Sequence, residues 1–158
     1  MAEAPLPEMN IHASCVALGA AGVLLLGKSG AGKSDLALRL IDDGAALVAD
    51  DRTILFTRRG TLYARAPDSI KDLLEIRGVG IVELKSRPNV KVSLVVQLGR
   101  EGERLPVHRL YRPPPPLSVR AAPPQIALNG THASTPAKVR AALAAFSKGL
   151  FRDTFVHK

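Results

Sequence analysis

Eight consecutive residues, Gly27-Lys28-Ser29-Gly30-Ala31-Gly32-Lys33-Ser34, have the types and spacing of a loop that binds nucleotide phosphates. The glycines let the backbone turn and approach phosphate oxygens closely. The loop N–H groups would form an anion nest, and a following helix would add the positive end of its dipole. Lys33 would place a cation on the β- and γ-phosphates, and Ser34 would offer a hydroxyl oxygen to Mg²⁺, which prefers oxygen ligands. The loop therefore predicts binding of a magnesium–nucleoside triphosphate.

The segments on either side of the loop support this interpretation. Residues 23–26 form a continuous apolar run, typical of a strand buried on both faces. Over residues 33–43 the apolar side chains recur on one helical face, and Gly44 is placed to end that helix. A strand, a glycine-rich loop and a helix in this order is the context that the phosphate-binding mechanism requires.

Two later groups of charged residues are candidates for the rest of a reaction centre. Asp50 and Asp51 follow an apolar strand predicted over residues 45–49. Because adjacent side chains of a strand face opposite ways, the two carboxylates can do different jobs. Glu75 and Arg77 lie among apolar residues and glycines. Each group also has an ordinary interpretation, the aspartates as a turn and the Glu75–Arg77 pair as a surface ion pair.

The rest of the chain reads mostly as strands. Residues 99–125 are rich in proline and form a long irregular stretch, which is a candidate for a mobile substrate clamp. Thr135 as N-cap and Pro136 at the first helical position would open a last helix. We further expect strands over residues 12–18, 79–82 and 90–98, a hairpin with its turn at residues 58–60, and a short helix over residues 70–74.

Composition limits the classes of function. The 158 residues, 46 % of them apolar, predict one domain with a core of Leu, Val, Ile and Ala. The net charge of +8 favours anionic partners, but scattered basic residues and only 4 % aromatics indicate no nucleic-acid partner. The single cysteine, Cys15, excludes an internal disulfide and is expected to be a buried, inert thiol. With no secretory signal and no bilayer-length apolar run, we expect a cytoplasmic protein without a membrane partner.

Many protein families share the phosphate loop, so the function has to come from the other residues. The chain has no Asn-Lys-x-Asp string of the kind that GTPases use to recognise guanine. Large motor ATPases need more than one domain of this size. Kinases of small molecules remain compatible with the length.

Four segments, taken in order, resemble the bacterial HPr kinase/phosphorylase family. They are His12-Ala13-Ser14, the phosphate loop, Val48-Ala49-Asp50-Asp51 and Leu74-Glu75-Ile76-Arg77-Gly78-Val79-Gly80. The resemblance covers residues 11–98 and is to the short form of the family, which has only the catalytic C-terminal domain. It implies a single α/β domain with the phosphate-loop fold and a sheet akin to that of phosphoenolpyruvate carboxykinase, with flanking helices. It also implies a flexible lead-in over residues 1–10, a catalytic domain over 11–147 and a tail over 148–158.

The resemblance also implies an activity. It indicates an ATP- and Mg²⁺-dependent kinase for one serine of HPr, a small phosphocarrier protein of the phosphotransferase system. It leaves open the reverse phosphorolysis and assembly into a homo-oligomer. By match to the family's motifs, Asp50 is the catalytic acid/base and His12 and Arg77 line the site. Lys33 acts with them on the phosphates, and the metal residues are Ser34, Glu75 and Asp51.

Two departures from the family pattern keep alternatives open. Lys28 stands where the family often has an acidic residue, and the family's basic Pro-Val-Arg-Pro-Gly-Arg-like segment has no counterpart in this chain. The kinase direction is therefore better supported than the phosphorylase direction. A kinase for a small molecule or another protein, and a non-catalytic nucleotide-binding regulator, remain as alternatives.

Overall fold

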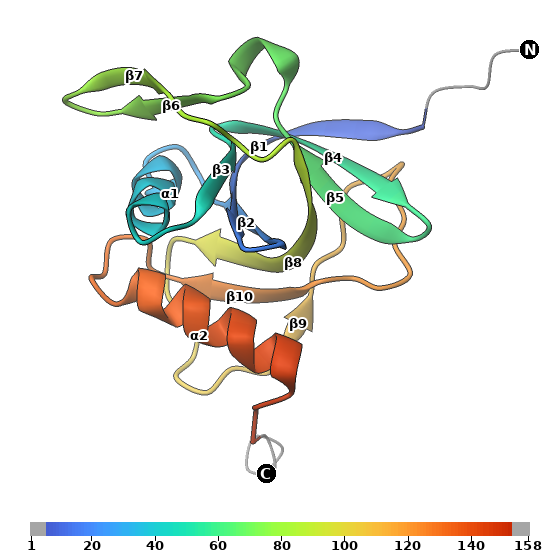
Figure 1. Cartoon of the computed structure of the whole chain (residues 1–158). Coiled ribbons are helices and arrows are strands. Elements are labelled where there is room, and N and C mark those ends of the chain that lie inside the picture. Colours follow the sequence, from blue (N-terminus) through green and yellow to red (C-terminus); the bar gives the residue numbers. More distant parts are fainter. Residues whose placement is uncertain (1–5, 153–158) are drawn as a thin grey trace, which may run out of the picture.

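Strands make up most of the molecule and curl around an apolar interior (Figure 1). The structure is a computed structural model that describes residues 6–152. Along the chain the elements are β1 (Glu8–Leu18), β2 (Ala21–Leu26), α1 (Lys33–Asp42), β3 (Ala46–Ala49), β4 (Arg52–Arg58), β5 (Thr61–Arg65), the 3-10 turn η1 (Asp68–Ile70), β6 (Leu73–Ile76), β7 (Gly80–Glu83), β8 (Asn89–Leu98), β9 (Arg109–Leu110), β10 (Pro124–Leu128) and α2 (Thr135–Lys148).

The main sheet closes on itself. Its strands follow the order β2-β1-β4-β5-β8-β10-β9, β3 pairs with β1, and β2 also pairs in parallel with β8. Strands β2, β1, β4, β5 and β8 therefore form a ring, and β10 and β9 extend the sheet beyond it. Helix α1 packs against β1, β2 and β3, while α2 runs along the outside of β8 and β10 (Figure 1). The described residues thus form a single mixed α/β domain with a curled sheet and two α-helices.

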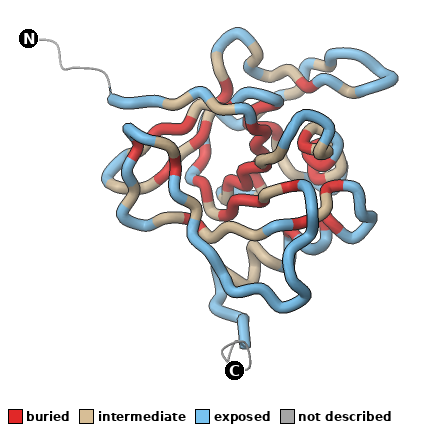
Figure 2. The backbone as a smooth tube through the Cα atoms, turned by 180° about the vertical axis from the view of Figure 1, so that it is seen from behind, coloured by how far each residue is buried: buried red, intermediate tan, exposed pale blue. Residues whose placement is uncertain are grey.

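Two apolar clusters explain why the ring strands are apolar on both faces. One cluster fills the ring and includes Cys15, Leu24 and Leu55. The other lies between the outer face of the ring and the helices, and includes Leu25 and Leu36. Successive residues of β2 thus enter different clusters, as the continuous apolar run predicts. Figure 2 shows the buried residues concentrated in these two regions.

Cys15 is fully buried inside the ring. Burial disfavours the thiolate and raises the pKa of this thiol to about 12. The thiol is therefore protonated at neutral pH, and the expectation of a buried cysteine is confirmed. Its lack of reactivity stays a prediction.

Several local expectations are confirmed. Strand β2 ends at Leu26, the glycine-rich loop follows, and α1 begins at Lys33. Gly44 has a φ of 108° just after that helix, a backbone conformation that glycine adopts without strain. Strands β4 and β5 form the expected hairpin around Arg59 and Gly60, both of which have positive φ.

Other local expectations are wrong. The short helix expected over residues 70–74 is instead the turn η1 followed by β6, because residues 73–76 pair with β7. Strand β1 begins at Glu8, so residues 8–10 of the predicted lead-in belong to a strand, while residues 1–5 of it lie outside the described residues. At the last helix, Ser134 is the N-cap residue, and Thr135 instead donates its hydroxyl to the backbone carbonyl of Asn129.

In residues 6–152 no helix is long and apolar enough to cross a bilayer.

Gly22 lies where β2 and β8 close the ring, and there we expect the fold to be sensitive to one added methyl group. A Cβ at this position would lie 2.5 Å from Val90 Cγ2 and 2.7 Å from the backbone oxygen of Lys91. Because backbone cannot move aside cheaply, Gly22→Ala should lower the free energy of unfolding by about 1–3 kcal/mol. Urea unfolding checks this, with Gly102→Ala as control, since a Cβ at Gly102 would meet its nearest neighbour at 3.6 Å. Equal stability of the two variants would contradict the tight strand pairing.

Candidate active site

The phosphate loop joins the end of β2 to the start of α1. Gly30 and Gly32 have φ values of 88° and 96°, which explains the need for glycine at both positions. A Cβ at Gly30 would meet no other atom within 4 Å, so this part of the loop faces open space. Gly32 is the N-cap residue of α1 and has no side chain to cap the helix. The first N–H groups of α1 are therefore available to an anion, as phosphate binding requires.

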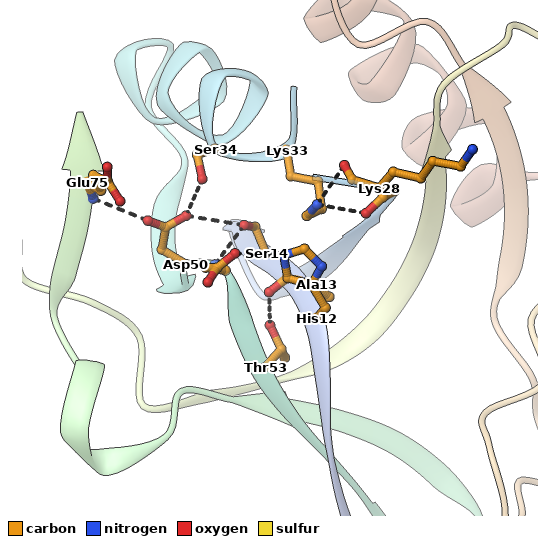
Figure 3. Close-up of polar contacts among 11 residues, drawn as sticks. His12, Ala13, Ser14, Lys28, Lys33, Ser34, Asp50, Thr53 and Glu75 are labelled. Atoms are coloured by element: carbon orange, nitrogen blue, oxygen red, sulfur yellow. Dashed lines mark hydrogen bonds and ion pairs between the residues drawn. The ribbon is translucent and has the colours of Figure 1, made fainter. Parts of the chain in front are cut away.

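Lys33 is buried beneath the loop and holds it together. Its Nζ donates hydrogen bonds to the backbone oxygens of Gly27, at 2.7 Å, and Lys28, at 3.1 Å (Figure 3). Burial lowers the pKa of this ammonium group, and the negative charges of Asp51 and Asp50 oppose that shift. An ammonium group has three donors, so the described residues leave one for a phosphate oxygen.

Asp50 is the centre of the polar network in Figure 3. It follows β3, is 7 % exposed, and accepts hydrogen bonds through both carboxylate oxygens. Its Oδ1 accepts from the hydroxyls of Ser34, at 2.6 Å, and Ser14, at 3.2 Å. Its Oδ2 accepts from the backbone N–H of Glu75 at 3.2 Å. A carboxylate offers about four lone-pair positions, so one remains for a substrate hydroxyl.

Asp51 has different partners from Asp50, as the sequence predicts, but for another reason. A φ of 67° at Asp51 turns the chain after β3, so the side chains separate through a turn rather than through strand alternation. The Asp51 carboxylate is 65 % exposed and lies 2.7 Å from His12 Nε2. Ser14 connects the two aspartates, because its hydroxyl also accepts the backbone N–H of Asp51 at 3.0 Å.

Glu75 and Arg77 lie on the β6–β7 hairpin, and the structure places them differently. Glu75 reaches Asp50 through its backbone, and its side chain is exposed beside Asp50 (Figure 3). Arg77 lies in the turn after β6, is exposed, and has no hydrogen bond or ion pair within residues 6–152. A Glu75–Arg77 ion pair is therefore not formed among these residues, and Arg77 is not brought to the Asp50 network.

The donor set near Asp50 suits a magnesium ion that keeps water and phosphate ligands. Among the described residues, no group of three or more His, Cys, Asp or Glu side chains could hold a metal ion alone. Mg²⁺ in nucleotide sites usually takes one or two protein oxygens plus substrate phosphates and water. Ser34 donates its hydrogen to Asp50 and retains lone pairs for a cation. Ser34 and a nearby carboxylate therefore fit a Mg²⁺ ion that completes its coordination with phosphate and water. The described residues do not provide a full set of protein ligands.

Two supporting contacts lie outside the predicted site. Arg39 of α1 donates hydrogen bonds to the backbone oxygens of Gly130 and, at 3.0 Å, His132. A Cβ at Gly130 would lie 2.5 Å from the backbone oxygen of Ala31, so this glycine touches the phosphate loop directly. The loop between β10 and α2 thus packs against the phosphate loop and is held to α1 by Arg39. In the sequence, the Asn-Gly pair at residues 129–130 is typical of a turn. The pattern does not indicate that this turn contacts the phosphate loop.

A cavity of about 1050 Å³ lies elsewhere, between residues 101–109, β10 and α2. Its lining includes Ile126, Ala142 and Phe151, but no residue of the phosphate loop and neither aspartate. The candidate site is therefore separate from this cavity. Its phosphate-binding side is an open loop surface.

Ser14 gives a test of the network that requires no substrate. Ser14→Ala removes a fully buried hydroxyl that bonds to both Asp50 Oδ1 and the Asp51 N–H. The variant leaves the backbone N–H of Asp51 without this acceptor and takes one of two hydrogen bonds from Asp50 Oδ1, which keeps the Ser34 hydroxyl. The loss should lower the free energy of unfolding by about 1–3 kcal/mol. Chemical denaturation measures this, with Ser118→Ala as an exposed control. A Ser14→Ala variant as stable as the control would contradict the bridging role.

The family model described as "HPr Serine kinase C-terminal domain" matches residues 4–112. The chain belongs to this family. The match contains the phosphate loop, Asp50 and Glu75, whereas Gly130 and α2 lie beyond it.

Individual relatives agree with the family match. An HPr kinase/phosphorylase from Caldicellulosiruptor bescii is 40 % identical over 118 residues, which cover 66 % of this chain and 38 % of that protein. One from Cupriavidus necator is also 40 % identical over 118 residues, covering 66 % of this chain and 36 % of the relative. The chain thus matches little more than a third of the length of these relatives.

A solved structure shares the fold. The HPr(Ser) kinase/phosphatase from Coxiella burnetii superposes with a TM-score of 0.74, covering 90 % of this chain and 98 % of that chain, at 23 % identity. This likeness supports the arrangement of the strands and helices. At this identity it does not assign roles to side chains.

Proposed function

We propose that the chain is an ATP- and Mg²⁺-dependent kinase that phosphorylates a serine of HPr. Membership of the HPr serine kinase C-terminal domain family supports this acceptor, and relatives named HPr kinase/phosphorylase support the reaction type. We also propose that the mixed α/β domain is a phosphate-loop domain whose sheet is akin to that of phosphoenolpyruvate carboxykinase. Residues 11–147 would be the catalytic domain, acting in the cytoplasm.

The observation that carries the proposal is the contact between Asp50 and Ser34. Asp50 Oδ1 lies 2.6 Å from the Ser34 hydroxyl, the last residue of the phosphate loop. A carboxylate suited to act as a base therefore adjoins the position where the γ-phosphate and its metal ion would lie. A protein that only bound nucleotide would not need a buried carboxylate with an acceptor position left over.

The phosphate loop would bind the nucleotide. The N–H groups at the start of α1 and the remaining donor of Lys33 would contact phosphate oxygens. Ser34, with Asp51 and Glu75 nearby, would hold Mg²⁺, which supplies neutralisation of the phosphate charge when bound. Lys33 would gain affinity for its proton from the added negative charge, opposing the effect of burial on its pKa.

Asp50 would act on the acceptor. In our proposal the serine hydroxyl of HPr donates a hydrogen bond to the fourth lone-pair position of Asp50. That carboxylate orients the oxygen for attack on the γ-phosphorus and takes the proton as the new O–P bond forms and the bond to ADP breaks. The hydrogen bonds from Ser14, Ser34 and the Glu75 backbone would keep the carboxylate in one orientation.

His12 and Arg77 have supporting roles in the proposal. His12 would fix Asp51 through their 2.7 Å contact and so line the site. Arg77 would add positive charge to the transferred phosphoryl group only when the β6–β7 hairpin moves closer upon substrate binding. The proposal covers the kinase direction, since the basic segment linked to phosphorolysis in the family has no counterpart in this chain.

Incubation with γ-labelled ATP, Mg²⁺ and HPr from the organism that encodes the chain tests the proposal. We expect label to appear on HPr, and to disappear when EDTA removes Mg²⁺. ATP binding without transfer would favour a non-catalytic regulator. Transfer to a small molecule or another protein, with HPr unlabelled, would favour a different kinase.

A further inference from the structure

The β6–β7 hairpin stands apart from the rest of the domain. Within residues 6–152, strand β6 pairs with β7 alone, so the two form a separate two-stranded sheet (Figure 1). Most of this hairpin is exposed (Figure 2), and within residues 73–83 one position is buried. That position is Leu74, which is 0 % exposed and anchors the hairpin to the body.

Two apolar side chains near the end of this arm face solvent. Val79 is 73 % exposed and Ile81 is 72 % exposed, the highest values among the large apolar residues of the described chain. Single exposed apolar residues are common on protein surfaces. Here, however, Val79 and Ile81 are two positions apart on the short β6–β7 hairpin, and a different residue, Leu74, packs the hairpin against the body. The fold therefore does not need Val79 or Ile81 to be apolar.

The arm is directly attached to the candidate active site. Ile81 is the cross-strand partner of Glu75, whose backbone N–H donates to Asp50 at 3.2 Å. Side chains of directly opposed residues lie on the same face of a two-stranded sheet. Ile81 is thus next to Glu75 on the face that Glu75 presents, and Val79 lies in the turn beyond it.

We propose that Val79 and Ile81 form a docking surface for the acceptor protein and contact apolar side chains beside its phosphorylated serine. The inference rests on the proposed kinase function and deepens it. A protein whose serine reaches Asp50 has to cover the strand that carries Glu75, and therefore the neighbouring face of β7. A nucleotide does not require this surface, because its phosphates bind the loop before α1.

The contact is apolar rather than electrostatic. Residues 73–83 carry two acidic side chains, Glu75 and Glu83, and one basic side chain, Arg77. Their charges nearly cancel, in contrast to the net charge of +8 for the whole chain. Recognition by this arm therefore depends on burying Val79 and Ile81 and should change little with salt.

Kinetics with a double variant test the docking surface. Val79→Ser/Ile81→Ser should raise the KM for HPr about tenfold, as expected for removing a small apolar contact cluster from an interface. The kcat and the KM for Mg-ATP should stay within about twofold of the native values, because the phosphate loop and Asp50 are untouched. Leu110→Ser/Leu150→Ser is the matched control, since these leucines are 57 % and 53 % exposed and lie in β9 and just after α2, away from the hairpin (Figure 1). That control should leave the KM for HPr unchanged.

The outcomes separate the docking proposal from the kinase proposal. If the native chain labels HPr and both double variants have the native KM for HPr, the docking surface is wrong and the kinase proposal stands. If both variants raise this KM equally, the effect is a general loss of surface apolarity, and the docking surface is again wrong. If the native chain fails to label HPr, both proposals fail together.

Size-exclusion chromatography completes the test: a hairpin variant that changes oligomeric state but not the KM for HPr would assign this face to a second copy of the chain and overturn the proposal.

Discussion

Asp50→Asn is expected to slow phosphoryl transfer from ATP to HPr by at least about a hundredfold. The substitution keeps the size of the side chain and its acceptor for the Ser34 and Ser14 hydroxyls. It removes the carboxylate that would take the serine proton, and it sets an amide against the backbone N–H of Glu75. Initial rates of HPr labelling at saturating ATP and HPr measure the effect.

Controls for this prediction separate catalysis from folding and binding. Asp42→Asn changes an exposed carboxylate on the last turn of α1 and should leave the rate unchanged. Fluorescent-nucleotide titration should show that Asp50→Asn still binds Mg-ATP, because the loop and Lys33 are intact. A variant that transfers phosphate at the native rate would remove Asp50 from the role of base. A variant that loses nucleotide binding would show that Asp50 acts mainly through Ser34 and the metal ion.

Gly130→Ala is expected to weaken Mg-ATP binding about tenfold. A Cβ at this position would lie 2.5 Å from the backbone oxygen of Ala31 and 3.3 Å from Leu98 Cδ1. The added methyl group therefore has to displace either the phosphate loop or a packed side chain of β8. Overpacking of this kind costs about 1–3 kcal/mol, and a loss of about 1.4 kcal/mol from binding is a factor of ten.

The test of Gly130 compares it with a second glycine that also lacks a positive φ. Neither Gly130 nor Gly102 has a positive φ, so an alanine is strained only by its neighbours. Gly102→Ala, with its nearest neighbour at 3.6 Å, should bind nucleotide like the native chain. Titrations of both variants with Mg-ATP, together with their thermal unfolding, decide between loop distortion and global destabilisation. Native affinity in Gly130→Ala would mean that the loop from β10 to α2 does not support the phosphate loop.

Local rules were enough to predict the strand, glycine-rich loop and helix around residues 27–34. Glycine spacing, an apolar strand and a helical pattern fix residues 27–34 because each rule acts within a few residues. The same rules predicted the end of α1 at Gly44 and the β4–β5 hairpin. The pattern also singled out Asp50 and Glu75, the family resemblance implied their roles, and the structure joins them by a hydrogen bond.

Non-local contacts could not be predicted from the pattern. The pairing of β2 with β8 closes the ring between segments about seventy residues apart in the chain, and no periodicity indicates it. The contact of Gly130 with Ala31 joins parts of the chain that are even farther apart. The helix expected over residues 70–74 is wrong at the start of the β6–β7 hairpin, because short apolar runs do not distinguish a helix from a strand.

The position of the transferred phosphate on HPr tests the central claim most directly. HPr is incubated with the native chain, ATP and Mg²⁺, and the site of modification is mapped by mass spectrometry after digestion. We predict one phosphate on one serine, with phosphorylation absent when Lys33→Met replaces the native chain, since Lys33 bonds to the loop backbone and, in our proposal, would also contact the phosphates. An unmodified HPr, or a phosphate on histidine rather than serine, would contradict the proposed kinase.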